Sequence, residues 1–468
     1  MLLKAFFFTM GFRSAQLLRL FMGVVLLVPG CAIAPTDFSQ VSDRLEERTG
    51  FRSGLKDEPE KTVIPPDVSL QDGVTLEEAI TIALWNNAAF QESLSGLSVS
   101  EAELIQANML QNPQFWGLFP TGPSPPGGPL EFAIRFPLEA LWLRPHKVAA
   151  AQRKMEQTVE GLIQNGLTLV RDVKVAFANS LLAEQRLGLT VKHAEILRHI
   201  AQIMESRWQA GEISELEAGT FRISALQAGE QIHQLMHEVT LVREQFRALI
   251  GLGFEDASIV LQHSATLPTT QRSAEELLTD ALATRPDLRA TELELEAAGQ
   301  RVGLARKEIF VLTGIYRAQQ TTTDPFNSRP GLQFTIPIFN QNQGGIALAE
   351  AGVAIAARRY VTIRDQIALE VRQAHTRWLQ TESSVRNWRQ RMLPAHQTAT
   401  LQAQKALEAG DATALLPLAA QQNWIQARIR EIELVAGQRQ AIAELERAIG
   451  HSLLSQPHHA PEPRLAPS

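Results

Sequence analysis

The sequence predicts a mainly helical protein with a small β part, in which a set of long antiparallel helices is duplicated in tandem. Three observations support this prediction. Several landmarks recur about 200 residues apart, and each half contains two long stretches with few helix breakers. Each half also contains two short aromatic or β-branched segments on either side of a loop-forming stretch. The chain is rich in Ala, Leu, Gln and Glu, which favour helices.

The duplication rests on near-constant offsets between four separated sites. Residues 84–90 align with 282–288 at an offset of 198, and residues 136–138 align with 336–338 at an offset of 200. Gly211 aligns with Gly410, and residues 250–251 align with 449–450, both at an offset of 199. We therefore expect a first repeat over residues 73–265 and a second over residues 266–453.

The amino terminus has the pattern of a lipoprotein signal. Lys4, Arg13 and Arg19 precede an apolar run over residues 20–28, which at nine residues is too short to span a bilayer. The run leads to Cys31, the one cysteine of the chain, in a context that resembles a bacterial lipobox. The resemblance implies a signal peptide over residues 1–30 and a lipidated Cys31. The alternative is an ordinary secretory signal with an incidental cysteine.

The next segments predict a leader, a helix and a strand pair. Residues 31–72 are polar and interrupted by prolines, so we expect an extended periplasmic leader. Thr75 and Glu78 form a capping-box pattern that begins a helix, which we expect to end near Leu110 before Asn112-Pro113. Strands are expected over residues 115–119 and 130–138 around a loop at 121–128, and again over 309–319 and 331–338 around 321–328. Residues 332–336 alternate apolar and polar, as a strand with one lipid face and one wet face would.

Long helices follow each strand pair. Helical stretches are expected over residues 147–209 and 345–409, returning over 214–249 and 413–449 after turns at Gly211 and Gly410. No other stretch has the roughly 18 apolar residues of a spanning helix, so entry into a membrane would require a closed β-barrel. The tail over residues 454–468 is expected to be disordered.

Composition and motifs argue against several functions. The net charge is −6 and the pI is near 6.1, which gives no indication of nucleic-acid binding. No nucleophile elbow, phosphate-binding loop or cysteine-zinc pattern is present, so we expect no enzyme activity and no cofactor. His233 and His237 are four residues apart on a predicted helix but have no third ligand nearby, so no metal site is predicted.

Several motifs together resemble the TolC-type outer-membrane efflux proteins. They are residues 74–79 (VTLEEA), residues 285–290 (RPDLRA) and the glycine turns at 207–214 and 408–413, within a resemblance that covers residues 74–451. The resemblance implies a homotrimer in which each chain gives four strands to a twelve-stranded β-barrel and its helices to an α-helical tunnel. Residues 339–347 are most similar to the outer-membrane subunits of heavy-metal resistance-nodulation-division exporters.

The family resemblance also implies that the glycine turns are periplasmic tips that contact an adaptor. The candidate contact residues are Arg207, Gly211, Glu212, Ser214, Gly410, Asp411 and Thr413. Acidic residues near the turns, Glu205, Glu215 and Glu408, are candidates for a cation-attracting aperture. The alternatives are simple tight turns and solvated carboxylates on helix faces.

The resulting functional prediction is an outer-membrane channel subunit of a tripartite efflux system. It would act as a passive export duct, with metal cations slightly favoured as cargo. Its partners would be two further copies of itself, a periplasmic adaptor, an inner-membrane pump and outer-membrane lipid, and Cys31 would anchor it on the periplasmic side. The alternatives are a drug or small-molecule duct of the same family, and a periplasmic coiled-coil lipoprotein without a pore.

Overall fold

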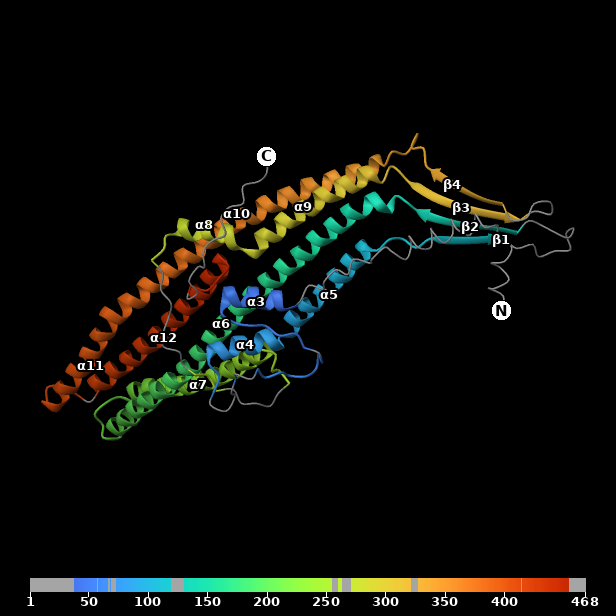
Figure 1. Cartoon of the computed structure of the whole chain (residues 1–468). Coiled ribbons are helices and arrows are strands. Elements are labelled where there is room, and N and C mark those ends of the chain that lie inside the picture. Colours follow the sequence, from blue (N-terminus) through green and yellow to red (C-terminus); the bar gives the residue numbers. More distant parts are fainter. Residues whose placement is uncertain are drawn as a thin grey trace. The chain divides into compact units, whose positions relative to one another are not determined.

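The duplication read from the sequence is present in the backbone of the computed structural model (Figure 1). The structure describes residues 38–56, 58–65, 68, 73–118, 130–254, 260–262, 271–320, 327–413 and 415–453. The predicted signal peptide, Cys31, the loop at 121–128, most of 321–328 and the tail at 454–468 lie outside these residues. The chain divides into two compact units, which are described separately below.

The two repeats have the same order of elements. The first contains α4 (Leu76–Asn86), α5 (Ala88–Asn108), β1 (Gln114–Leu118), β2 (Leu130–Pro137), α6 (Ala140–Gln209) and α7 (Glu215–Leu249). The second contains α8 (Ala274–Thr284), α9 (Pro286–Lys307), β3 (Leu312–Gln320), β4 (Asn327–Phe334), α10 (Gln343–Asn387), a π-helical turn (Trp388–Met392), α11 (Leu393–Glu408) and α12 (Leu415–Ile449). Helices therefore dominate, as predicted.

The first unit (Ser98–Gln157 and Glu292–Arg359) contains one antiparallel sheet in the order β1-β2-β3-β4. The two predicted strand pairs are thus joined, because β2 pairs with β3 across the repeats. Strand β4 begins and ends four residues earlier than predicted. It includes Pro330, which a strand at the sheet edge tolerates because the missing N–H need not join a ladder.

The strand register separates side chains onto two different faces. Residues paired across antiparallel strands lie on the same face, so the pairs Phe115↔Ile134, Ile134↔Tyr316 and Gly314↔Leu332 define one face. This apolar face carries Phe115, Leu130, Phe132, Ile134, Phe136, Leu312, Tyr316, Ala318, Pro330, Leu332 and Phe334. The opposite face carries every charged residue of the strands, together with Trp116, Leu118, Ala133 and Ile315. In β4, Leu332 and Phe334 lie on the apolar face and Gln333 on the opposite face, so the predicted alternation is present up to the end of the strand. That these faces meet lipid and water stays a prediction.

The predicted helix from residue 76 to about 110 is wrong, because the chain breaks at Asn87. Asn87 has an extended backbone (φ −61°, ψ 118°). Its side-chain Oδ1 accepts from the N–H of Phe90 at 2.9 Å, and its Nδ2 donates to the carbonyl of Leu249 at 2.8 Å. The side chain therefore caps α5 and also holds the end of α7.

The second repeat breaks at the corresponding residue, Arg285, which is also extended (φ −65°, ψ 128°). Its Nη1 donates to the carbonyl of Ala448 at 3.0 Å, the position that corresponds to Leu249. Because the guanidinium is buried, its charge needs partners. Asp287 and Glu370 supply them, at 2.5 Å and 2.7 Å.

The predicted extended leader is also wrong over residues 38–49, which form helix α3 (Phe38–Thr49). Val41 and Leu45 are four residues apart and fully buried, so the helix has an apolar face despite its many charges. Leu45 lies against Gly166 of α6, where an added Cβ would meet its side chain at 2.8 Å. Arg48 donates to the carbonyls of Thr284 and Gly450, which joins α3 to the second repeat.

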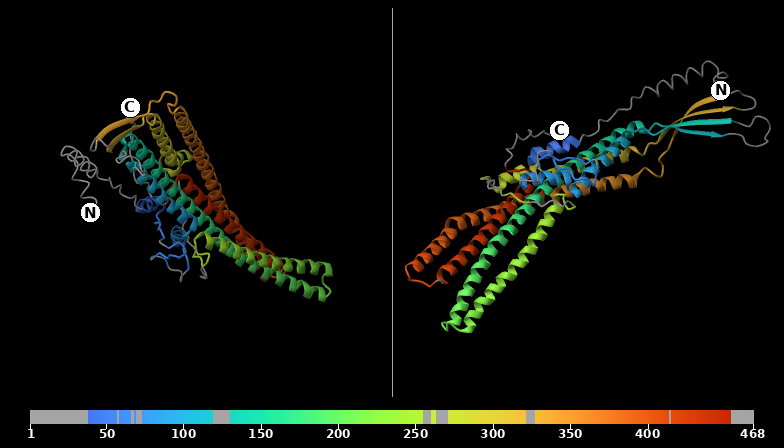
Figure 2. Two further views of the ribbon diagram at one scale, coloured as in Figure 1. Left: turned by 90° about the vertical axis from the view of Figure 1, so that its right-hand side faces the viewer. Right: turned by 90° about the horizontal axis from the view of Figure 1, so that it is seen from below.

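The second unit (Asp37–Leu97, Thr158–Thr291 and Tyr360–Ser468) holds the long helical hairpins (Figure 2). Helix α6 has 70 residues, about 105 Å at 1.5 Å per residue. The corresponding stretch of the second repeat was predicted as one helix but contains the π turn. Pro394 has no N–H to donate, and the N–H of Leu393 reaches back five residues to the carbonyl of Trp388. No helix in the described ranges is both long and apolar enough to cross a bilayer.

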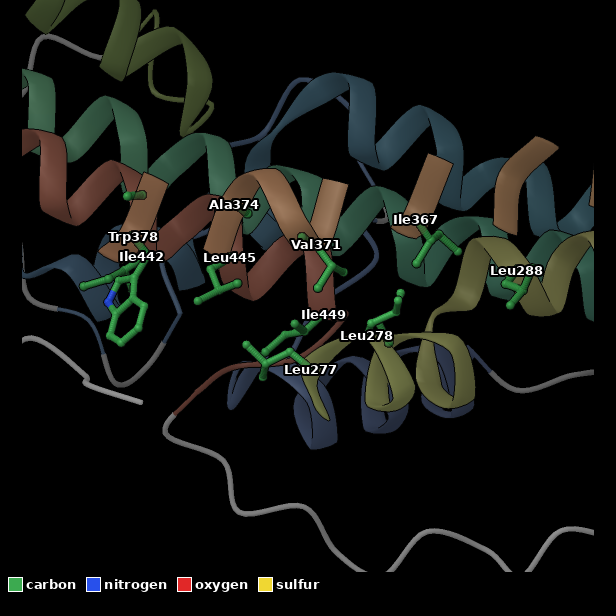
Figure 3. Packing of buried hydrophobic residues seen from close by; sticks show 13 residues of the cluster. Leu277, Leu278, Leu288, Ile367, Val371, Ala374, Trp378, Ile442, Leu445 and Ile449 are labelled. Atoms are coloured by element: carbon green, nitrogen blue, oxygen red, sulfur yellow. The ribbon is translucent and has the colours of Figure 1, made fainter. Parts of the chain in front are cut away.

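One apolar cluster joins α8, α9, α10 and α12 (Figure 3). Leu277 of α8, Ile367 and Val371 of α10, and Leu445 and Ile449 of α12 are all fully buried. Because α8 is short, most of its stability comes from this packing and not from its own helix propensity. The cluster surrounds the end of α12, where Arg285 also binds.

Substitution of Gly251 tests how tightly the end of α7 is held. Its φ of +80° disfavours any side chain, and an added Cβ would lie 2.3 Å from the carbonyl oxygen of Asn86. We expect Gly251→Ala to lower the free energy of unfolding by about 3 kcal/mol or more, measured as a lower thermal transition temperature. Gly211→Ala is the matched control, because its φ is +78° but nothing lies within 4 Å of its Cβ. Equal effects of the two substitutions would contradict this account.

A second prediction concerns pH. His451 Nε2 lies 2.9 Å from Asp280 Oδ2, and Arg272 Nη1 donates to the same oxygen. Burial opposes charge on His451, but the hydrogen bonds to Asp280 and to the Ser452 carbonyl outweigh it and raise its pKa. The hydrogen bond from His451 lowers the pKa of Asp280.

The histidine contribution to stability is therefore fully present below about pH 6.5, the ordinary His pKa, and is lost as pH rises through its raised folded-state value. The aspartate contribution is present above about pH 3.9 and is lost at more acidic pH. We expect the thermal stability of His451→Gln to fall less than that of the unchanged protein between pH 6 and pH 8, roughly the window in which this histidine titrates. Parallel curves for the two proteins would rule out this coupling.

Candidate functional site

The two hairpin turns at Gly211 and Gly410 have the same backbone geometry. The N–H of Glu212 donates to the carbonyl of Arg207 at 2.9 Å, and that of Gly211 donates to Trp208 at 2.9 Å. In the second turn Asp411 donates to Ala406 at 2.9 Å and Gly410 to Leu407 at 3.0 Å. Both are Schellman motifs, which end a helix with a left-handed residue. Gly211 (φ +78°) and Gly410 (φ +80°) provide that residue.

Arginines bind two of the acidic residues at the first turn, Glu205 and Glu212. Arg207 Nε lies 3.0 Å from Glu212, and Arg222 Nη2 lies 2.5 Å from Glu205. The hydrogen bond and the charge of Glu205 raise the pKa of Arg222 above its usual value. Arg207 therefore pairs with a carboxylate of its own turn, and its contact with an adaptor stays a prediction. The first turn thus has two neutralised carboxylates.

Glu215 and Ser214 begin the helix that follows the first turn. Ser214 Oγ accepts from the N–H of Glu217 at 3.2 Å, so Ser214 is the N-cap of α7. Glu215 is exposed in the first turn of α7, where a carboxylate interacts favourably with the helix dipole. Both residues therefore have a structural explanation at this turn.

The second turn carries carboxylates without arginine partners. Ala406 stands where the first turn has Arg207, and Glu408 and Asp411 are exposed. Within the described part of the chain neither carboxylate is in an ion pair. Thr413 is also exposed, and its carbonyl accepts from the N–H of Leu416 at 3.1 Å. The two turns therefore match in backbone shape and differ in charge.

A shared apolar cluster lies behind the turns. Ile200 and Met204 of α6, Ala228 of α7 and Ile425 of α12 are buried together. Ile213 in the first turn and Leu415 just after the second pack against this cluster. The cluster therefore links the two hairpins near their turns, and the turns themselves are exposed in the single chain.

Other candidate residues do not gather into a site. His233 and His237 are both exposed on α7, and the described residues contain no group of three metal-binding side chains. The segment at 339–347 leads into α10. Asn342 in this segment has a positive φ of 58° and donates from Nδ2 to the carbonyl of Ala305 at 2.8 Å. This segment therefore serves to start a helix.

Two features of the site were not predicted from the sequence. Arg222 lies 17 residues from Glu205, and only the return of the hairpin brings them together. The gathering of all strand charges on one face depends on the pairing of β2 with β3. The alternation of apolar and polar residues, clearest in β2, was the available signal for the second feature.

The chain matches the model of the outer membrane efflux protein family over residues 133–252 and 277–451. The matched segments lie in both repeats and include both glycine turns, the second part of β2, and all of β3 and β4. The chain belongs to the outer membrane efflux protein family. That family consists of efflux proteins and not of enzymes. The membership of this chain confirms the family resemblance found in the sequence.

Relatives with curated names agree with this assignment. The efflux protein is 27% identical over 385 residues to the cobalt-zinc-cadmium resistance protein CzcC of Cupriavidus metallidurans, which covers 81% of this chain and 90% of CzcC. It is 25% identical over 309 residues to the pyoverdine export outer membrane protein OpmQ of Pseudomonas putida, covering 64% of each chain.

Solved structures share the fold. A crystal structure of CusC superposes with a TM-score of 0.66 at 16% identity, covering 85% of this chain and 98% of CusC. The outer membrane protein VceC of Vibrio cholerae gives a TM-score of 0.66 at 17% identity, covering 81% of this chain and 96% of VceC. The predicted fold class of tandem long helices with a small strand part is thereby confirmed.

The first turn allows a test of whether its ion pair contributes to the stability of the fold. The Arg207–Glu212 pair is largely exposed, and such pairs contribute about 1 kcal/mol or less to stability. We therefore expect Arg207→Ala to leave the thermal transition of the efflux protein nearly unchanged. Circular dichroism melting of Arg207→Ala, with Glu212→Ala as its partner variant, checks this. A large loss of stability in either variant would give the pair a structural role.

Proposed function

We propose that three copies of this chain assemble into a passive export duct of the outer membrane. The observation that carries the proposal is the four-stranded sheet, whose edge strands β1 and β4 each pair on one side only with a strand of the described chain. Its apolar face suits lipid and its charged face suits water. A sheet of this kind leaves backbone donors and acceptors unpaired unless further strands are added. Three copies would close it into a barrel of twelve strands.

The family assignment and the fold support a duct for export across the outer membrane. The long hairpins of the second unit would form the tunnel that receives cargo. In this proposal the energy for transport comes from an inner-membrane pump. A lipid anchor at Cys31, on the periplasmic side, remains part of the proposal.

Metal cations are the proposed cargo. CzcC is named for cobalt, zinc and cadmium resistance, and its alignment covers 90% of its own length. The OpmQ alignment is shorter and covers 64% of that protein, so export of small organic molecules is the second candidate. Specificity in such a system would be divided between the pump and the duct.

The glycine turns are the proposed contacts with a periplasmic adaptor. The exposed residues at these turns include Glu212, Ser214, Asp411 and Thr413. The difference in charge between the turns gives each copy two unlike docking sites. A trimer would thus present three pairs of sites and not six equal ones.

Gly211→Pro tests this arrangement. Proline fixes φ near −65°, which is incompatible with the φ of +78°, and it removes the N–H that donates to Trp208. We expect loss of cobalt, zinc and cadmium tolerance in cells that depend on this duct, while the purified variant keeps the mass of a trimer. Gly219→Ala is the control, because this helical glycine has nothing within 4 Å of its Cβ.

The outcomes distinguish the parts of the proposal. Normal metal tolerance with the proline variant, at normal protein level, would refute the adaptor role of the turn. If the protein without substitutions purifies only as a monomer, the trimeric duct is refuted. If cells that lack the duct tolerate cobalt, zinc and cadmium as well as cells that contain it, the cargo belongs to another class of molecule.

A further inference from the structure

The charged face of the sheet carries an excess of arginine. In the described strands this face holds Arg135, Arg317 and Arg329 against one carboxylate, Glu131. The net charge of the described strands is therefore positive, although the whole chain has a net charge of −6. The sheet thus differs in sign from the rest of the molecule.

Most of this positive charge is not neutralised. Arg317 Nε lies 2.8 Å from Glu131 Oε1, so this arginine has a partner. Arg135 and Arg329 are exposed, and neither is in an ion pair with another described residue. Arg317 and Arg329 are also directly opposite each other on β3 and β4, so their guanidinium groups belong to the same face of the sheet.

The segments that connect β1 to β2 and β3 to β4 do not reverse the sign. Residues 119–129 contain no charged residue, and residues 321–326 contain only Asp324. With Asp324 included, the stretches 114–137 and 312–334 hold three arginines and two carboxylates. The surplus thus remains positive.

The apolar face fixes which way the arginines point in a membrane. A charged side chain is costly on a lipid-facing strand, and the apolar face carries no charge at all. The arginines therefore face the water-filled side of the closed sheet. Rings of Arg or Lys in a pore attract anions and repel cations.

We infer that Arg135, Arg317 and Arg329 form an anion-preferring zone in the wall of the duct. This inference rests on the proposed trimer, in which the three chains would supply nine arginines. Small anions would concentrate at this zone. A metal would pass it more easily together with its counter-anions, or within an anionic complex, than as a bare dication. The exposed carboxylates Glu408 and Asp411 would act on the same ions with the opposite sign at the hairpin turns.

Ion selectivity in planar bilayers tests the inference. The purified full-length trimer is placed between unequal KCl concentrations, and the reversal potential gives the ratio of chloride to potassium permeability. We expect Arg135→Gln with Arg329→Gln to lower this ratio by about twofold or more in dilute salt, and by less in concentrated salt, because ions screen the charges. The two single variants should each give a part of this change.

The charge-conserving variant Arg135→Lys with Arg329→Lys is the matched control, and we expect it to keep the original ratio. A conducting trimer whose ratio is the same with arginine, lysine and glutamine would overturn the anion-preferring zone and leave the duct intact. An unchanged protein that forms no trimer or never conducts would overturn the proposed duct itself. If the double glutamine variant does not assemble, the single variants decide the question in the same way.

Discussion

The rest of the fold depends on how the carbonyl groups at the end of the last helix in each repeat find hydrogen-bond donors. A helix leaves its final carbonyls without partners, and these must be satisfied when they are buried. Asn87 meets this need for Leu249, and Arg285 meets it for Ala448. Each of these residues also breaks a helix, so the same position sets the entry angle of one helix and holds the end of another. In each repeat this position, which we call the junction, connects the two short helices to the end of the last long helix.

The two junctions use different chemistry in the same place. An amide suffices in the first repeat, whereas the buried guanidinium of the second requires Asp287 and Glu370. Glu370 is further shared with Arg447 at 3.3 Å. Truncation of one member of such a buried group leaves the others uncompensated, and this is more costly than loss of a neutral hydrogen bond. The second repeat is therefore less tolerant of substitution at this point.

Much of the fold could be predicted because local patterns decided it. The capping box at Thr75 and Glu78, the four strands and the glycine turns follow from residues close together in sequence. The break at Asn87 was missed because asparagine also occurs within helices, and its bond to Leu249 spans 162 residues. Helix α3 was missed because only two of its four buried residues, Val41 and Leu45, are apolar. At the turns, the positions were predictable, but the pairing of Glu205 with Arg222 depended on the hairpin return.

The π turn has a consequence for how α12 is covered. A straight helix drifts around its neighbour by about 20° per heptad, so the contact stripe of the 45-residue α10 would gradually turn away from α12. Yet contacts with α12 occur on both sides of the turn, at Trp378 before it and at Thr400 after it. Trp388 and Arg389 in the turn itself bind Ala427 and Glu431 of α12. The wide turn thus shifts the phase of the apolar stripe, so that α11 and the part of α10 in the second unit both contact α12.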